Sequence, residues 1–166
     1  AAPSLHSIRP CLEGAIPAIM ATCDPDGTPN VAYISQVVYV DAAHVALSFQ
    51  FFNKTRQNIL RNPRASVLVL DPLTAYFYRL HLLYERTEDS GPVFESMRAQ
   101  LAGIASHAGM AEVFELKGAD IYAVERIESV AGEGLPAPVP RSGLLHTLRL
   151  CSESIARCSG PVSYTH

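Results

Sequence analysis

Apolar and polar residues alternate in short runs through position 130 of the chain, and turn-forming residues separate these runs. Alternation with a period of two is typical of strands that have one buried and one exposed face. On this basis we predict six strands, at residues 16–23, 30–40, 45–50, 65–70, 75–87 and 119–130. The connections at 24–27 and 41–43 are short, which favours two successive hairpins in an antiparallel meander.

Two segments break the alternation and have helical features instead. The segment at 53–60 lies between the third and fourth predicted strands and stops at Asn62-Pro63, a pair that is unfavourable within a helix. Gly91-Pro92 begins a longer helix, because proline is favoured at the first helical position. Apolar residues then recur at helical spacing, at Val93, Phe94, Met97, Leu101, Ile104 and Ala105.

The composition changes after residue 131, which we take as the end of the main domain. Residues 132–143 are rich in proline and glycine and are typical of a linker. Leu144, Leu148, Cys151, Ile155 and Cys158 follow at alternating spacings of four and three, which predicts a C-terminal helix at 144–160. This helix either packs back on the domain or leads into a missing one. The pattern ends at 161–166, an irregular tail of truncated or read-through character.

Length and composition restrict the class of protein. A chain of 166 residues with 48% apolar residues and a net charge of −3 suits one soluble domain, and we expect it in the cytoplasm. The chain lacks the basic excess that is typical of a nucleic-acid-binding protein. It also has no apolar run long enough to span a membrane. The four cysteines lack paired spacing and are expected to be free thiols. The six histidines are scattered, so we expect no metal site.

The start of the short helix carries the most chemical information. Lys54, Thr55 and Arg56 place two cations and a hydroxyl beside free backbone N–H groups. Helix N-termini favour anions, and these side chains add donors that suit a phosphate. The alternative is that the cations form the solvated face of a short helix.

Two motifs of the chain are characteristic in order and spacing. One is Asp24-Pro25-Asp26-Gly27-Thr28-Pro29-Asn30; the other is Asn53-Lys54-Thr55-Arg56-Gln57-Asn58-Ile59 followed by Asn62-Pro63-Arg64-Ala65. Both resemble stretches of the pyridoxamine-phosphate-oxidase-like FMN-binding split barrels. The resemblance covers roughly residues 14–130. It implies a mainly β (α+β) fold, a six-stranded antiparallel split β-barrel with flanking helices, and a homodimer with FMN at its interface.

The resemblance also implies a set of cofactor-binding residues. Lys54 and Thr55 stand where the family grips the flavin phosphate, although the vitamin B6 oxidases have lysine at the second position; Arg56 is the candidate for the missing charge. The full set of candidates is Tyr33, Ser35, Gln36, Ser48, Phe49, Asn53, Lys54, Thr55, Arg56, Asn58 and Arg79. No nucleophile, base and orienting carboxylate can be assembled from the residues, so no catalytic side chain is assigned. This does not exclude an enzyme, because a bound flavin itself supplies the electron or hydride chemistry.

Our first hypothesis is an FMN-dependent oxidoreductase acting on an unidentified small-molecule substrate. True pyridoxamine-phosphate oxidase activity is disfavoured, because the chain has no tryptophan and enters a linker where those enzymes hold substrate. The second hypothesis is a non-catalytic flavin-binding sensory or regulatory module coupled to a C-terminal GAF-like domain. A third keeps the barrel and replaces FMN by the deazaflavin F420 or by haem.

Overall fold

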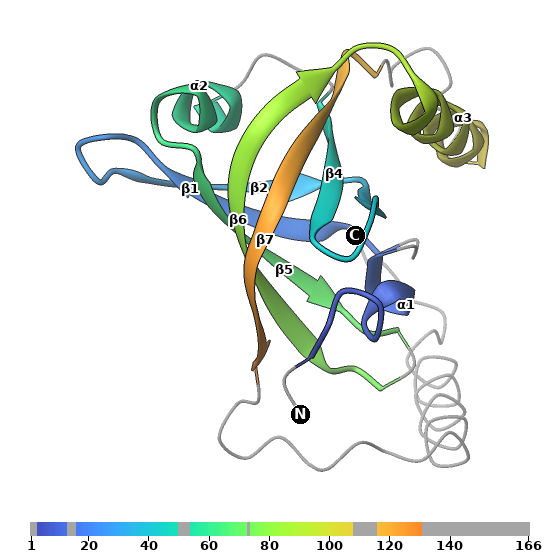
Figure 1. Cartoon of the computed structure of the whole chain (residues 1–166), viewed down its shortest axis with the longest axis horizontal. Helices are drawn as coiled ribbons and strands as arrows, with labels where there is room; N and C mark the ends of the chain where they lie inside the picture. The colour runs from blue at the N-terminus through green and yellow to red at the C-terminus, as the bar shows by residue number, and fades with distance from the viewer. Residues whose placement is uncertain (1–2, 13–15, 50–53, 73, 108–115, 131–166) are drawn as a thin grey trace, which may run out of the picture.

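The computed structural model describes residues 3–12, 16–49, 54–72, 74–107 and 116–130 (Figure 1). The elements in chain order are α1 (Arg9–Leu12), β1 (Ala18–Cys23), β2 (Pro29–Ile34), β3 (Val37–Tyr39), β4 (His44–Phe49), α2 (Lys54–Arg61), β5 (Arg64–Leu70), β6 (Phe77–Glu88), α3 (Pro92–His107) and β7 (Gly118–Val130). The predicted linker, C-terminal helix and tail lie outside the described residues, as does Asn53.

The seven strands form one antiparallel sheet in the order β2-β1-β5-β6-β7-β4-β3. The sheet curls into a half-barrel, which confirms the predicted split-barrel class (Figure 1). Seven strands are present instead of six because the predicted strand at 30–40 is divided. Its first part is β2 and its second part is β3, and Ser35 and Gln36 form the corner between them.

This corner determines how the barrel is arranged. β2 pairs with β1 at one edge of the sheet, and β3 pairs with β4 at the other edge. Since β2 and β3 are consecutive in the chain, the corner brings the two edges together. Both predicted hairpins are therefore present, but they do not form one continuous meander.

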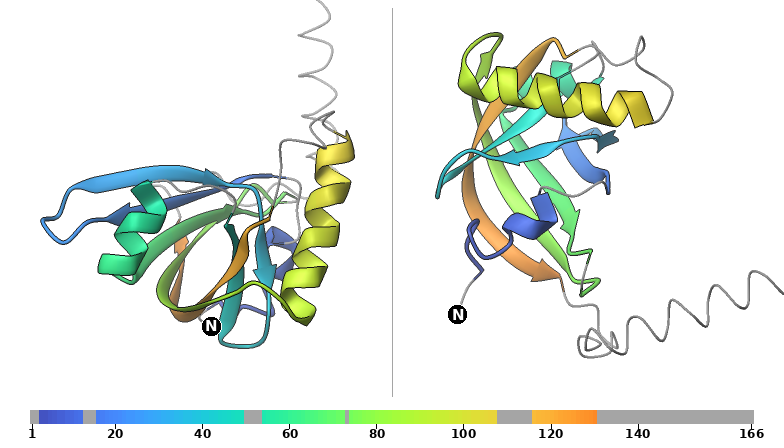
Figure 2. Two further views of the ribbon diagram at one scale, coloured as in Figure 1. Left: turned by 90° about the horizontal axis from the view of Figure 1, so that it is seen from above. Right: turned by 90° about the vertical axis from the view of Figure 1, so that its right-hand side faces the viewer.

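Two apolar cores hold the elements in place. The larger one fills the concave side of the sheet and includes Met20, Val67 and Leu80. The smaller one lies between α3 and the convex side, where Ala46 and Ile121 meet Met97. Figure 2 shows α3 lying along the outside of the strands. β4 is consequently buried on both faces, which explains its nearly continuous apolar sequence.

The two longer helices begin where the sequence predicts. α3 begins at Pro92, directly after Gly91, whose φ of +94° lies in the left-handed region that glycine adopts without strain. α2 begins at Lys54 and ends just before Asn62-Pro63. None of the described helices is both long enough and apolar enough to cross a membrane.

Candidate functional site at the start of α2

A buried polar cluster lies where α2 packs on the first hairpin. Thr22 of β1 and Thr55 and Asn58 of α2 are at most 9% exposed, and Asn30 of β2 is half-buried. The Asn30 side-chain amide donates to Thr55 Oγ1 at 2.9 Å and to Thr22 Oγ1 at 3.4 Å. Asn58 Nδ2 also donates to Thr22 Oγ1, at 3.2 Å. Four neutral side chains from three elements thus fix the position of the helix start.

The cluster gives the Thr55 hydroxyl a defined role. Its oxygen already accepts a hydrogen bond from Asn30, so its hydrogen is available as a donor. Thr55 is the second residue of α2, beside backbone N–H groups that have no partner within the helix. The arrangement therefore presents donors to an acceptor at the helix start, as an anionic ligand requires.

Lys54 lies at the rim of this cluster and forms an ion pair. Its Nζ is 2.6 Å from Asp24 Oδ2, at the start of the turn between β1 and β2. The Lys54 side chain is 44% exposed, whereas that of Asp24 is 14% exposed. The cation is therefore accessible from solvent, although a carboxylate of the same chain already contacts it.

Arg56 points away from this rim into a second network. Its guanidinium donates to Asp120 Oδ1 of β7 at 2.6 Å and to Thr87 Oγ1 of β6 at 2.9 Å. Thr87 also donates to Asp120 Oδ1, at 2.6 Å, and the Arg56 guanidinium lies 5.6 Å from the centre of the Tyr84 ring. Arg56 and Asp120 are 15% and 9% exposed. This pair anchors α2 to the last two strands of the barrel.

Three further predicted residues gather at the corner between β2 and β3. Ser35 Oγ and Ser48 Oγ are 3.2 Å apart, and Gln36 Nε2 donates to the Met97 carbonyl of α3 at 3.4 Å. Gln36 is 6% exposed, and its Oε1 has no hydrogen-bond partner. A buried amide oxygen of this kind is satisfied by a water or by an N–H group of a ligand.

The other predicted residues lie elsewhere. Tyr33 of β2 is 80% exposed, on the convex face of the sheet. Arg79 of β6 lies on this face too and pairs with Glu128 at 3.7 Å. Phe49 ends β4, but its side chain, like the whole of Asn53, lies outside the described part of the structure. The structure thus divides the predicted set among the α2 start, the β2–β3 corner and the convex face.

Sequence reasoning missed the carboxylates that pair with the two cations. Asp24 and Asn30 belong to the hairpin motif that resembles the family, but neither is among the candidate residues that the sequence indicates. Asp120 lies in β7, far from α2 in sequence, and its neighbours Ala119 and Ile121 indicate only a buried strand. No local pattern pairs it with Arg56.

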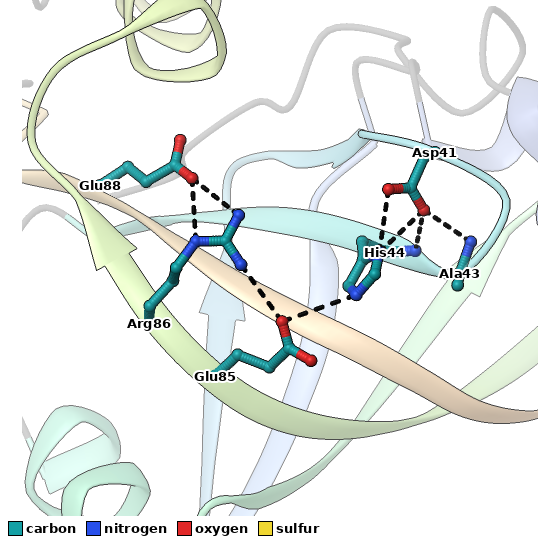
Figure 3. A network of polar contacts seen from close by, with 6 residues as sticks. All are labelled: Asp41, Ala43, His44, Glu85, Arg86 and Glu88. Atoms are coloured by element: carbon teal, nitrogen blue, oxygen red, sulfur yellow. Dashed lines mark hydrogen bonds and ion pairs between the residues drawn. The ribbon is translucent and has the colours of Figure 1, made fainter.

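A polar network without a sequence signal joins the β3–β4 turn to β6 (Figure 3). His44 Nδ1 lies 2.8 and 2.9 Å from the two Asp41 oxygens, and His44 Nε2 lies 3.5 Å from Glu85 Oε2. Backbone N–H groups and His44 lower the pKa of Asp41. Arg86 continues the network to Glu85 and Glu88. These contacts link the turn to β6 across the intervening strand β7.

A small cavity and a buried thiol lie beside the corner between β2 and β3. No group of three or more potential metal ligands occurs among the described residues. A cavity of about 10 Å³ lies beside Cys11 and Ser35, which is room for about one water molecule. Burial raises the pKa of the Cys11 thiol to about 11, so this thiol is protonated at neutral pH.

The curled antiparallel sheet and the helix start packed on its first hairpin define a split β-barrel. The family model of pyridoxamine 5'-phosphate oxidase matches residues 5–125, so the chain belongs to this family. This confirms the family resemblance seen in the two sequence motifs. Among curated proteins, none matches the chain.

Solved structures share the fold at low sequence identity. An FMN-binding protein from Syntrophomonas wolfei is 17% identical, with a TM-score of 0.66 over 77% of this chain and 86% of that one. HupZ of Group A Streptococcus is 20% identical, with a TM-score of 0.60 over 81% and 98%. A heme binding protein from Mycobacterium smegmatis is 17% identical, with a TM-score of 0.52 over 86% and 60%. At these identities the likeness establishes the fold alone.

Proposed function

We propose that this protein binds FMN and acts as an FMN-dependent oxidoreductase on a small organic substrate. The observation that carries the proposal is the donor set at the start of α2, in a chain that belongs to the pyridoxamine 5'-phosphate oxidase family. Thr55 offers a hydroxyl hydrogen, Lys54 an accessible ammonium group and α2 its first backbone N–H groups. All three suit a terminal phosphate.

The residues of the β2–β3 corner fit the ring part of a flavin. Gln36 Oε1 is a buried acceptor without a partner, and the Ser35 and Ser48 hydroxyls lie beside the same corner. An N–H group at the edge of a flavin ring satisfies such an acceptor. When bound, the flavin supplies the electron or hydride transfer, and the protein positions and shields it.

The experiment is a binding titration of the purified protein with FMN and with riboflavin, which lacks the phosphate. We expect Lys54→Ala to weaken FMN binding by about tenfold or more, because a charge-assisted hydrogen bond contributes about 1.5–3 kcal/mol. Arg61→Ala is the matched control, since Arg61 is an exposed cation at the other end of α2. Failure of the wild type to bind FMN, or unchanged affinity in Lys54→Ala, contradicts the proposal.

Turnover decides between the enzyme and the non-catalytic alternatives. Reduction of bound FMN by NADH or NADPH, followed by reoxidation with multiple turnovers, supports the oxidoreductase. Tight FMN binding without turnover supports the sensory or regulatory module instead. If the protein binds haem or F420 more tightly than FMN in the same titration, the proposed cofactor changes and the fold assignment stands.

We also propose that the protein forms a homodimer through the convex face of its first hairpin. Ile19, Val31 and Tyr33 are 37%, 67% and 80% exposed, and Ile19 lies opposite Tyr33 in the register. An exposed apolar group on one sheet face is typical of an interaction surface. A second copy covering it also brings Tyr33 and Arg79 to the interface, where the resemblance implies that the cofactor binds.

Light scattering after size-exclusion chromatography tests the dimer. Tyr33→Asp is expected to yield monomers, because it buries a charge in an apolar contact. Leu60→Asp is the control, since Leu60 is 62% exposed but lies on α2. A monomeric wild type, or a Tyr33→Asp variant that stays dimeric, refutes this interface. Because Cys11 and Cys23 are free thiols, we further propose a cytoplasmic location.

A further inference from the structure

We propose that Asp24 is an internal competitor for the phosphate site and sets how tightly the protein holds an anionic ligand. The inference rests on the proposed function, since it concerns the Lys54 end of the same site. Its basis is the 2.6 Å contact between Asp24 Oδ2 and Lys54 Nζ. The ammonium group that is offered to a phosphate is already in contact with a carboxylate.

The Asp24 carboxylate is the fixed partner of this pair. Its Oδ1 accepts a hydrogen bond from the Asp26 backbone N–H at 3.2 Å, within the turn that joins β1 to β2. The Asp24 backbone N–H donates to the Thr28 carbonyl, and Gly27 N–H donates to the Asp24 carbonyl. Lys54 has a long side chain and is three times as exposed. The turn therefore presents the carboxylate, and Lys54 reaches toward it.

The local charges cancel where sequence reasoning expects a positive site. Lys54 is matched by Asp24, and Arg56 is matched by Asp120. A phosphate that reaches Lys54 also approaches Asp24, and like charges in one site disfavour each other. If the phosphate displaces Asp24, it leaves a carboxylate that is only 14% exposed without its cation, which is also unfavourable.

The alternative to competition with the phosphate is that Asp24 positions Lys54 for the ligand. One substitution distinguishes these two roles. Asp24→Asn keeps an oxygen that accepts the hydrogen bond from Asp26 N–H, so the turn is preserved. The Oδ2 atom that accepts from Lys54 is replaced by an amide NH2 group, which only donates, so Lys54 is released. The negative charge and its contact with Lys54 are both lost, and the local charge becomes positive. A competitor role then predicts tighter phosphate binding, and a positioning role predicts weaker binding.

We test the inference by measuring the dissociation constants of FMN and riboflavin for the wild type, Asp24→Asn and Asp26→Asn. Asp26 lies in the same turn and is exposed, so it is the matched control. We expect Asp24→Asn to tighten FMN binding by about five- to tenfold, the effect of removing one nearby like charge in a partly solvated site. Riboflavin binding should not change, because riboflavin has no phosphate. Asp26→Asn should alter FMN binding by less than about twofold.

A second measurement tests whether the carboxylate repels the phosphate when Lys54 is absent. In a Lys54→Ala background the carboxylate has lost its partner and repels the phosphate directly, so Asp24→Asn should still tighten FMN binding relative to Lys54→Ala alone. Unchanged or weaker FMN binding by Asp24→Asn, with an unaltered melting temperature, overturns the inference and favours the positioning role. An equal gain for riboflavin also overturns it.

The outcomes keep this inference distinct from the proposed function. If the wild type binds neither FMN nor riboflavin, the proposed function fails and Asp24 has no phosphate to exclude. If the wild type binds FMN and Lys54→Ala weakens that binding, the phosphate site stands. The response of Asp24→Asn then decides the role of the carboxylate alone.

Discussion

Replacing Arg56 by methionine should destabilise the fold strongly, because it breaks a buried ion pair from one side. Methionine retains the apolar length of the side chain and removes the guanidinium. Asp120, which is 9% exposed, then loses its cation and keeps the hydrogen bond from Thr87. Leaving one charge of a buried pair uncompensated costs about 3–5 kcal/mol. We expect about 3 kcal/mol here, because Arg56 is 15% exposed and some solvent reaches the pair.

The measurement is urea unfolding of the wild type and of Arg56→Met, monitored by circular dichroism. The matched control is Arg64→Met, because Arg64 also pairs with a carboxylate, Glu125, but these side chains are 67% and 36% exposed. Exposed pairs contribute about 0–1 kcal/mol, so the control should unfold near the wild-type midpoint. If Arg56→Met costs no more than Arg64→Met, the conclusion that Arg56 anchors α2 is wrong.

Three other predictions concern the turn, the acid range and the buried thiol. Gly27→Ala should lower the unfolding free energy by about 1–2 kcal/mol in urea, since φ is +87°, whereas Gly103→Ala in helical backbone should stabilise by up to about 1 kcal/mol. A hydrogen bond from His81 is the largest cause that lowers the pKa of Glu128 below 4.5. The ionised Glu128 carboxylate therefore contributes its full stabilisation above pH 4.5, and this contribution declines as the pH falls through the lowered pKa of the folded state. In Glu128→Gln the melting temperature should fall less steeply with decreasing pH than in the wild type. Cys11 should resist iodoacetamide at pH 7 until the protein unfolds, as peptide mass spectrometry can show, because burial raises its pKa to about 11.

Much of the fold is predictable from local pattern, because strand alternation and helix punctuation are local properties. Pro92 marks the start of α3, and Asn62-Pro63 follows the end of α2. The division of the second predicted strand at Ser35 and Gln36 was not predictable, since apolar residues continue on both sides and no glycine or proline marks a turn there. Sheet order was not predictable either. It depends on β4 pairing with β7, and no residue of the first hairpins encodes this distant partner.

The site was predictable in position but not in charge balance. The sequence indicates Lys54, Thr55 and Arg56 at a helix start, and the structure places Thr55 in a buried polar cluster there. What a linear pattern does not show is which carboxylates fold against these cations. Asp120 lies in β7, far from α2 in sequence, and pairs with Arg56. A count of basic residues at the helix start therefore overestimates the positive charge available to a ligand.

The pairing of β4 with β7 has a consequence for synthesis of the chain. His44–Phe49 finds its neighbour only when Gly118 and the following residues have been made, several seconds later at roughly 5–20 residues per second. During that interval the first two hairpins have emerged, but the strand that lies between β4 and β6 is missing. An apolar edge at Val45, Ala46 and Leu47 is then exposed on the nascent chain. Ribosome-associated chaperones should therefore engage this protein before its seventh strand appears.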